Sequence, residues 1–352
     1  MSKQKEAKKN LEEVMKELNK KYGSGSVING NNREIHDEVV STGSLGLDAA
    51  IGIGGLPKNS GKIVEIYGWE SSGKSTLAQS IIANFQKEGV KCLLVDAEDS
   101  LDAKYSTNLG ISLKDLIVVQ LDEYGGEGAY NKVEQLVSTG EIGLVVIDSY
   151  NALQPLSIVQ GEVGDSALGK HARMLNQAVM KCNILAIKYN VLFIFLGQLR
   201  EKIGVLYGSP ETTQGGNALR FYSHLRLKVS RSTTTDNSIM EGTNKIGNKT
   251  TVKVEKNKLG QPFKSCSFNI IYGQGIDKMG EIMQLASDFE IIKKWGKSIT
   301  VYGKQGQETK FPEDEYRKSL ENPVIFNDLK ELVIEKIKNA DIKVEEPTNE
   351  EV

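Results

Sequence analysis

Apolar runs of strand length alternate with helical stretches through most of this chain, from about residue 36 to residue 276. Runs of this kind, separated by helices, indicate a mostly parallel sheet with helices on its faces. The pattern therefore predicts an α/β fold with a mostly parallel central sheet. The runs are Lys62–Tyr67, Lys91–Asp96, Leu116–Gln120, Leu144–Asp148 and Val191–Leu196.

The N-terminal segment has a helical pattern. Residues 3–22 carry apolar side chains at helical spacing, while Lys and Glu dominate the other faces. The segment is either a surface helix with solvated faces or a helix whose apolar stripe docks on another copy of the protein, and periodicity alone favours neither. The following GSGSVINGNN is typical of a flexible connection. The apolar positions are Leu11, Val14, Met15, Leu18 and Tyr22.

The pattern changes again toward the C-terminus. After Arg226, the segments LRLKVSRS, TTVKVEKNK and SCSFNIIYG are typical of antiparallel strands at one edge of a sheet. Beyond Gly275, helical stretches at Glu281–Ile292 and Asn327–Ile337 predict a small separate α/β domain, and the acidic end of the chain predicts a mobile tail. We therefore expect an N-terminal helix and linker at residues 1–35, a core at 36–276, a small domain at 277–340 and a tail at 341–352.

Composition limits the class of function. The formal net charge is -2, from 44 basic and 46 acidic side chains, which argues against DNA binding through bulk positive charge but leaves room for a local basic groove. Cys92, Cys182 and Cys266 lie far apart without a CxxC pair, so a disulfide scaffold or a zinc site is not expected. The start of the chain is polar, and its most apolar run is too short to cross a bilayer. We expect a soluble cytoplasmic protein.

The strongest chemical signal is the segment Gly68–Ser75, which reads GWESSGKS and matches GxxxxGK[ST]. An apolar strand, IVEIY, precedes it and a helical stretch follows it, as a phosphate-binding loop requires. Glycines let backbone N–H groups point at phosphates, and the positive end of the helix adds to the attraction. We expect Lys74 to bridge the terminal phosphates and Ser75 to bind Mg²⁺. The alternative is an incidental glycine-rich turn.

Carboxylates follow two other strands of the expected sheet. LVVIDS places Asp148 at a strand end, where beside a phosphate-binding loop it can support Mg²⁺, although many ordinary strands end in the same way. LLVDAED ends in Asp96, Glu98 and Asp99. One of these could activate the attacking water, and Glu98 is the candidate. The alternative for Glu98 is an exposed loop carboxylate.

Longer motifs are more specific than the phosphate-binding loop. In order, the chain contains STGSLGLDAAIGIGGLP, KIVEIYGWESSGKST, VDAEDSLDAKY, LVVIDSYNAL, GEVGDSALGKHARM, GQLREKIGVLYGSPETTQGGNALRFY, VEKNKLGQPFK and IIYGQGI. Their order and spacing resemble those of bacterial and phage members of the RecA family along nearly the whole chain. Trp69 stands where this family usually has a proline, and residues 277–340 align loosely, which puts duplex capture by the small domain in doubt.

The resemblance implies roles for the nucleotide-binding residues. Asp148 would support the metal, Glu98 would position the attacking water, and Asp102 and Tyr105 would flank the adenine of ATP. Gln198 matches a glutamine that senses the terminal phosphate and couples it to the following loop. The residues that would hold the triphosphate and Mg²⁺ are Gly68, Trp69, Glu70, Ser71, Ser72, Gly73, Lys74, Ser75 and Thr76.

The resemblance also implies assembly and DNA binding. Lys256 and Lys258 match lysines that reach the ATP of a neighbouring protomer, so that hydrolysis depends on assembly, and the N-terminal helix matches one that packs on the adjacent subunit. Loops at about 160–169 and 199–213 would face single-stranded DNA, and mobile loops of this kind suit sequence-independent contacts to the DNA backbone. The matching DNA-contact positions are Arg173, Arg200, Gly215, Gly216, Asn217 and Arg220.

The function that the resemblance implies is a DNA-dependent ATPase recombinase. Such a protein uses ATP and Mg²⁺ to form a helical filament on single-stranded DNA and pairs that strand with a homologous duplex. The family also implies a possible repressor as a co-protease target, for which we assign no residues. One alternative is a non-catalytic filament or coat protein, which would not need Glu98, Gln198 and the two lysines. The other is a ring-forming helicase, against which the long N-terminal helix and GSPETTQGGNALRFY argue.

Overall fold

The computed structural model of the chain describes residues 10–23, 25–30, 38–162, 169–201, 211–213, 216–231, 238–302 and 308–339. The chain divides into two units, residues 1–37 and 38–352. In the first unit, helix α1 (Leu11–Tyr22) begins after Asn10 and buries none of its residues. The expected acidic tail lies outside the described residues, and the expected domain boundaries stay predictions.

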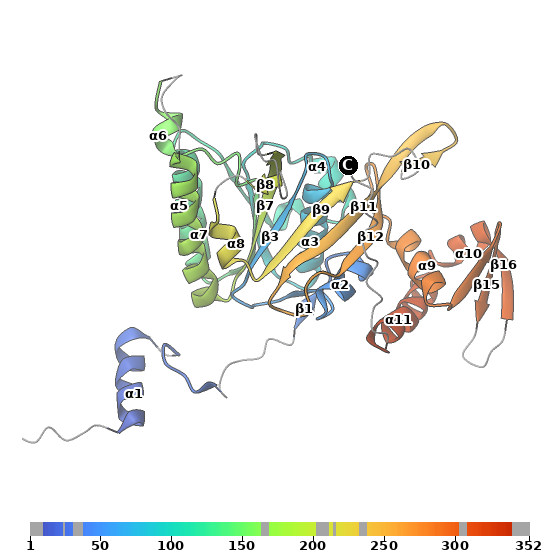
Figure 1. Cartoon of the computed structure of the whole chain (residues 1–352), viewed down its shortest axis with the longest axis horizontal. Helices are drawn as coiled ribbons and strands as arrows, with labels where there is room; N and C mark the ends of the chain where they lie inside the picture. The colour runs from blue at the N-terminus through green and yellow to red at the C-terminus, as the bar shows by residue number, and fades with distance from the viewer. Residues whose placement is uncertain are drawn as a thin grey trace, which may run out of the picture. The chain divides into compact units, whose positions relative to one another are not determined.

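A large mixed sheet forms the centre of the second unit (Figure 1). Its strands follow the order β13-β12-β11-β9-β3-β7-β6-β4-β5, and β10 and β8 pair with β11 and β7. The pairs from β9 across to β5 are parallel, and β9, β11, β12 and β13 pair antiparallel. The strands are β3 (Ile63–Gly68), β4 (Lys91–Asp96), β5 (Leu116–Gln120), β6 (Ile142–Asp148), β7 (Leu192–Glu201), β8 (Glu211–Thr213), β9 (Leu225–Arg231), β10 (Ser238–Glu241), β11 (Asn244–Asn257), β12 (Ser265–Ile271) and β13 (Gly275–Ile276).

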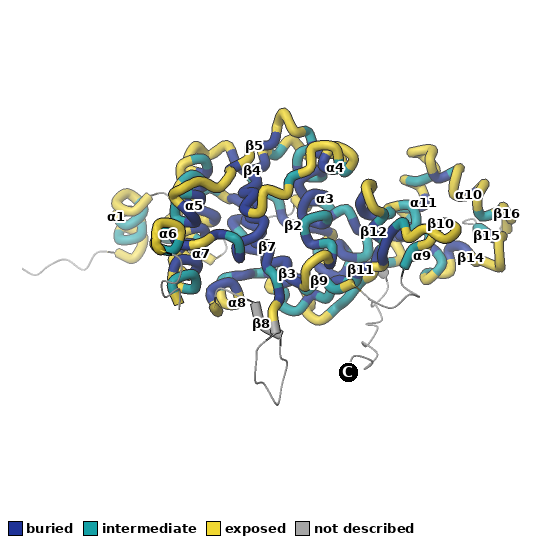
Figure 2. Tube along the Cα trace, turned by 90° about the horizontal axis from the view of Figure 1, so that it is seen from above, coloured by how far each residue is buried: buried dark blue, intermediate teal, exposed yellow. Residues whose placement is uncertain are grey.

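Helices cover the parallel part of the sheet, and this explains the continuous apolar runs. Every residue of β3 is buried, as the dark central strands of Figure 2 illustrate. Side chains that alternate along the central strands contribute to two separate hydrophobic clusters, one with helix α3 and the other with helices α5 and α7. The helices of this region are α2 (Leu45–Ile51), α3 (Lys74–Lys87), α4 (Ala103–Asn108), α5 (Gly125–Val137), α6 (Leu156–Val159), α7 (Lys170–Tyr189) and α8 (Ala218–Tyr222).

The C-terminal part has a hydrophobic cluster of its own. A three-stranded antiparallel sheet in the order β14-β15-β16 packs with three helices. Short strands β1 (Val39–Val40) and β2 (Leu56–Pro57) and the 3₁₀ turn Leu113–Asp115 complete the second unit. The C-terminal elements are α9 (Lys278–Asp288), β14 (Ile292–Trp295), β15 (Ser298–Tyr302), β16 (Glu308–Pro312), α10 (Glu313–Ser319) and α11 (Pro323–Asn339).

The expected fold class is confirmed, and two of the expected elements differ in detail. LRLKVSRS was expected as an antiparallel strand, but β9 runs parallel to β3 on one side and antiparallel to β11 on the other. The helix expected at Glu281–Ile292 ends at Asp288, and Ile292 is the first residue of strand β14. Among the described residues, no helix combines the length and apolar character needed to cross a membrane.

Candidate functional site: the carboxyl edge of the parallel strands

The phosphate-binding loop connects β3 to α3, and its geometry requires glycine at both ends. A Cβ added at Gly68 would lie 2.0 Å from the carbonyl oxygen of Val229. Gly73 has a φ of +100°, and a Cβ there would lie 2.5 Å from Cδ1 of Ile270. The loop therefore turns tightly against strands β9 and β12 before α3 begins at Lys74. This conformation aims the N-terminus of a long helix at the site, as anion binding requires.

Lys74 lies beneath this loop. Its side chain is buried, and Nζ donates a hydrogen bond to the carbonyl oxygen of Trp69 at 2.6 Å. Burial lowers the pKa of Lys74, while the carboxylates of Asp148, Glu98 and Glu70 act against this shift. The three carboxylates therefore help to keep the buried ammonium in its charged form.

Asp148 and Ser75 supply hard oxygen atoms next to Lys74. Asp148 ends β6, and its carboxylate accepts a hydrogen bond from the Ser75 side chain. Burial raises the pKa of Asp148 to about 6, and the Ser75 contact opposes this shift. A hydroxyl and a carboxylate suit Mg²⁺, which prefers oxygen ligands. Within the described part of the chain, the buried Ser72 hydroxyl of the same loop has no hydrogen-bond partner, so the loop also fits a phosphate.

Glu98, two residues after the end of β4, makes its hydrogen bonds at this edge. It accepts hydrogen bonds from the Ser149 hydroxyl and from Nε2 of Gln198, the latter at 3.1 Å. Asp96 instead accepts the backbone N–H groups of Ser100 and Leu101, both at 3.0 Å, and so shapes the following loop. The fold thus brings Glu98, Gln198, Asp148 and Lys74 together, because their strands end at one edge of the sheet.

The two residues expected beside the adenine lie on α4. Asp102 caps this helix, and its carboxylate accepts the Tyr105 backbone N–H at 2.6 Å. The Tyr105 hydroxyl lies 2.8 Å from the hydroxyl of Thr76, which connects α4 to the phosphate-binding loop. The sequence reasoning assigned no residue of the turn Tyr272–Gly275, although it had singled out IIYGQGI. Asn108 holds this turn against α4 through a 2.9 Å hydrogen bond to the Gly273 carbonyl.

Lys256 lies away from the phosphate-binding loop of its own chain. It pairs with Arg226 on β9, whereas Gly68 of the loop pairs with Val229, further along that strand. Its Nζ donates hydrogen bonds to the carbonyl oxygens of Arg220 and Phe221, at 2.6 and 3.1 Å, at the end of α8. Burial lowers the pKa of Lys256, as do the nearby charges of Lys258 and Arg226.

The expected DNA-contact residues divide into those that the structure describes and those outside it. Gly215 and residues 163–168 and 202–210, which make up much of both expected loops, lie outside the described residues. Arg173 and Arg220 are exposed in the first turn of α7 and on α8. The turn at Gly216 lies against α7, because a Cβ there would be 3.6 Å from that of Ala172. Arg200, near the end of β7, and Asn217 are also exposed.

The sequence did not point to a buried charged network around Arg226. The guanidinium of Arg226 donates a 2.5 Å hydrogen bond to Glu65 of β3 and lies 4.5 Å from the centre of the Tyr67 ring. The Tyr67 hydroxyl donates to Glu255, the residue before Lys256. The one signal was an acidic residue inside the apolar run IVEIYG. This network connects the strand of the phosphate-binding loop to the strand of Lys256.

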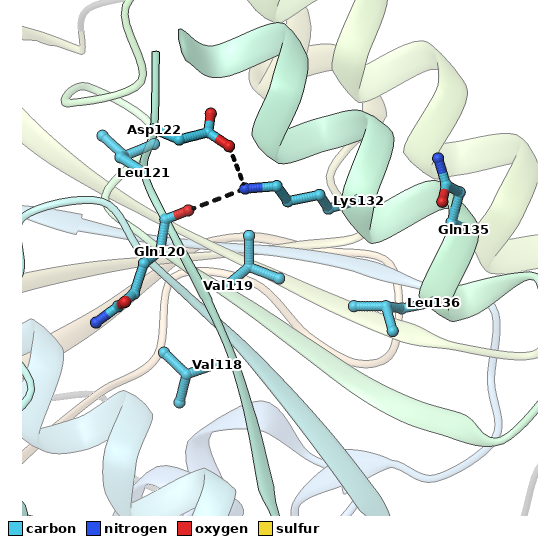
Figure 3. Close-up of a pocket in the computed structure, with 8 residues that line it drawn as sticks. All are labelled: Val118, Val119, Gln120, Leu121, Asp122, Lys132, Gln135 and Leu136. Carbon is cyan, nitrogen blue, oxygen red and sulfur yellow. Dashed lines mark hydrogen bonds and ion pairs between the residues drawn. The ribbon is translucent and has the colours of Figure 1, made fainter. Parts of the chain in front are cut away.

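A separate hollow of about 590 Å³ lies between β5 and α5, away from these groups (Figure 3). Lys132 spans its rim, with Nζ 2.6 Å from the Asp122 carboxylate and 3.4 Å from the Gln120 carbonyl. Apolar side chains form much of the remaining wall. The lining residues are Val118, Val119, Gln120, Leu121, Asp122, Lys132, Gln135 and Leu136.

Comparisons with known proteins agree with this geometry. The family model of the RecA N-terminal domain matches residues 9–277. The protein RecA of Bordetella avium (strain 197N) is 47% identical over 293 residues, which are 83% of this chain and 81% of that protein. The RecA proteins of Bordetella pertussis (strain Tohama I) and Bordetella petrii are each 46% identical over 293 residues, 83% of this chain and 81% and 80% of those proteins. The chain therefore belongs to the RecA recombinase family.

Proposed function

We propose that the chain is a DNA-dependent ATPase recombinase that forms an ATP-bound helical filament on single-stranded DNA and catalyses homologous pairing and strand exchange. The observation that carries the proposal is the hydrogen bond between Gln198 and Glu98. It connects the strand leading into one expected DNA loop with the carboxylate best placed to act on water. A phosphate-binding loop that served only to bind ATP would not need this connection.

Each residue at the carboxyl edge has a defined task in this proposal. The backbone of Gly68–Thr76 and the Lys74 ammonium hold the triphosphate, and the Ser75 hydroxyl and Asp148 hold Mg²⁺. When bound, Mg²⁺ neutralises charge on the phosphate oxygens. Glu98 accepts the proton of the attacking water, and the Gln198 amide orients the reacting groups. Positioning and charge stabilisation supply most of the rate enhancement in phosphoryl transfer, so this small set is sufficient.

Assembly completes the site in this proposal. Lys256 and Lys258 contribute positive charge to the ATP of a neighbouring protomer, which makes hydrolysis depend on the filament. The apolar stripe of α1 docks on another copy, and the apolar side chains that line part of the hollow beside β5 offer a suitable surface (Figure 3). The contacts to the DNA backbone come from Arg173, Arg200, Arg220 and the turn Gly215–Asn217. The DNA sequence is then read by base pairing alone.

The deciding experiment is ATP hydrolysis by the purified chain, with and without single-stranded DNA. We expect strong stimulation by DNA, followed by strand exchange with a homologous duplex but not with an unrelated one. Hydrolysis that ignores DNA would contradict the proposed coupling through Gln198 and favour another kind of ATPase, whereas the absence of hydrolysis would favour a non-catalytic coat. Closed rings in place of extended filaments in electron micrographs would favour the helicase alternative. Cleavage of a repressor in the presence of these filaments would test the co-protease role.

A further inference from the structure

The turn that follows Asp148 carries two buried side chains, Tyr150 and Asn151, that have no role in the proposed reaction. The side-chain carbonyl of Asn151 accepts a hydrogen bond from the backbone N–H of Gln198 at 2.7 Å. Asn151 is 8% exposed and Tyr150 is fully buried. The backbone of the residue that contacts Glu98 is therefore held by a side chain from the neighbouring turn.

The strand pattern explains why a side chain is needed at this point. The pairing of β6 with β7 ends at Ile147 and Phe195, one residue before β6 itself ends. Beyond it, the Tyr150 N–H donates to the Leu196 carbonyl at 3.1 Å, and the Asn151 side chain then receives the Gln198 N–H. A backbone N–H left unpaired in a buried place costs free energy. The turn therefore supplies the hydrogen bonds to β7 that β6 no longer makes.

Tyr150 fixes the residue before Gln198 by packing. A Cβ added at Gly197 would lie 2.4 Å from the Tyr150 hydroxyl oxygen and 2.7 Å from two carbons of its ring. The Tyr150 hydroxyl donates to Glu65 of β3 at 3.3 Å, which limits where the ring can move. Gly197 and Tyr150 are thus matched in size, and any larger side chain at position 197 would displace the ring or the end of β7.

The same turn also reaches the other expected DNA loop. The Tyr150 carbonyl lies 3.0 Å from Nε2 of His171, in the first turn of α7. Helix α7 begins directly after the segment of the first loop, and β7 leads directly into the second. Tyr150 and Asn151 therefore contact the first turn of the helix that follows one expected loop and the strand residues that precede the other. They directly follow Ser149, whose hydroxyl binds Glu98.

We propose that Asn151 is a positioning residue for Gln198, and that the Tyr150–Asn151 turn connects both DNA-facing loops to the hydrolytic carboxylate. This inference rests on the proposed function. The side-chain amide of Gln198 meets Glu98 only while its backbone keeps its register at the end of β7. Asn151 sets that register through one hydrogen bond, so removing the acceptor weakens the transmission of DNA binding to hydrolysis without removing any group that contacts ATP.

Three variants separate this role from a structural one. Asn151→Leu keeps the size of the side chain but removes the acceptor, whereas Asn151→Asp keeps an acceptor oxygen at the same place. Gln154→Ala is the matched control, because the exposed Gln154 side chain donates a hydrogen bond to the Asn151 backbone carbonyl, at 3.2 Å, and not to its side chain. The measurements are kcat and KM for ATP with and without single-stranded DNA, together with the thermal unfolding midpoint.

We expect Asn151→Leu to lower kcat in the presence of DNA by about tenfold, the effect of one unpaired buried N–H group. Its KM should stay close to that of the wild type, and its unfolding midpoint should fall by no more than the loss of this one hydrogen bond explains. Asn151→Asp should recover most of kcat, and Gln154→Ala should behave as the wild type. Wild-type stimulation by DNA in Asn151→Leu would overturn the inference, and so would equal impairment of the Leu and Asp variants.

A second pair of variants keeps the inference testable if Asn151→Leu does not fold. Gly197→Ala adds a methyl group that must displace the Tyr150 ring, and Tyr150→Val in the same chain restores the space. We expect Gly197→Ala to lower kcat with DNA and the double variant to regain part of it. An unchanged kcat in Gly197→Ala would contradict the inference. Wild-type hydrolysis that ignores DNA would instead contradict the proposed function itself.

Discussion

Gln198 donates a 3.1 Å hydrogen bond through its side-chain amide to the carboxylate of Glu98, 100 residues earlier in the chain. Glu98 also accepts a hydrogen bond from Ser149, which follows Asp148. Two strand ends therefore determine the position of one carboxylate. A group held in this way can respond both to a bound phosphate and to a shift of β7, and that double dependence is what coupling between DNA and ATP requires.

Glu98→Gln should separate assembly from hydrolysis. The variant keeps the size of the side chain and an acceptor for Ser149 and Gln198 but cannot accept a proton, so hydrolysis should fall by about a hundredfold or more. ATP binding should persist, and filaments on DNA should be long-lived in electron micrographs. Asp99→Asn neutralises the next carboxylate along and serves as the control. Normal hydrolysis in Glu98→Gln would remove Glu98 from its proposed role.

Lys74→Ala should abolish ATP-driven assembly. The buried ammonium is the cation placed beneath the phosphate-binding loop, and without it the triphosphate loses its main charge partner. Binding of a fluorescent ATP analogue and filament formation on DNA are the measurements. Extended filaments made by this variant with ATP would show that the loop is wrongly assigned.

The parallel core was predictable because the patterns that indicate it lie within short segments of the sequence. Each central strand is apolar along its length, and Lys74 and Asp148 belong to motifs at the ends of such strands. The choice of Glu98 depended on the family resemblance. The fold confirms the sheet and its class. Whether these residues act as assigned stays a prediction for the variants to test.

Other features depend on pairings that no local pattern contains. Glu65 is a single acidic residue in an apolar run, and its partner Arg226 lies 161 residues further along the chain. The role of Asn151 requires that β6 stops pairing before β7 does. The direction of β9 was missed on one side because its alternating pattern is the same whether a neighbour is parallel or antiparallel. The helix was predicted too far, up to Ile292, because apolar residues continue past its end at Asp288 into strand β14.

Mixed filaments should show that Lys256 acts on a neighbouring protomer. Lys256→Met and Lys74→Ala should each hydrolyse ATP poorly when alone. When they are mixed, an interface between an intact phosphate-binding loop and an intact Lys256 forms from the two different chains, so activity should reappear. Lys253→Met, at a half-buried lysine on the same strand, is the control for loss of charge. Mixed filaments that form on DNA but are as inactive as their components would place Lys256 outside the shared site.

Lys256→Met should also loosen the end of α8. The ammonium now contacts the carbonyl oxygens of Arg220 and Phe221, the end of a helix where positive charge is stabilising. Without it, we expect faster hydrogen exchange at the backbone amides of residues 221–223, with core strands such as β3 unaffected. The effect on stability should be about 1 kcal/mol or less, because half-exposed contacts of this kind are weak. Unchanged exchange in this segment would mean that the lysine does not restrain α8.

The junction between α2 and α9 should make stability depend on pH through Glu281. Its carboxylate accepts the N–H groups of Leu45 and Gly46 at 3.1 Å each, and burial raises its pKa from 4.5 to about 7. The folded chain therefore holds this proton more tightly than the unfolded chain, and the resulting stability is lost as the pH rises through this range. Asp48, whose pKa burial raises to about 6, acts in the same direction.

Glu281→Gln, which has no such proton to lose, should reduce the fall in the unfolding midpoint between about pH 5 and about pH 8. Asp48 should maintain a smaller decline in that variant. Glu321→Gln, at an exposed carboxylate of the same C-terminal part, should match the wild type. Parallel pH curves for the wild type and Glu281→Gln would mean that Glu281 keeps its ordinary pKa, and that its contacts with the start of α2 offset the cost of burial.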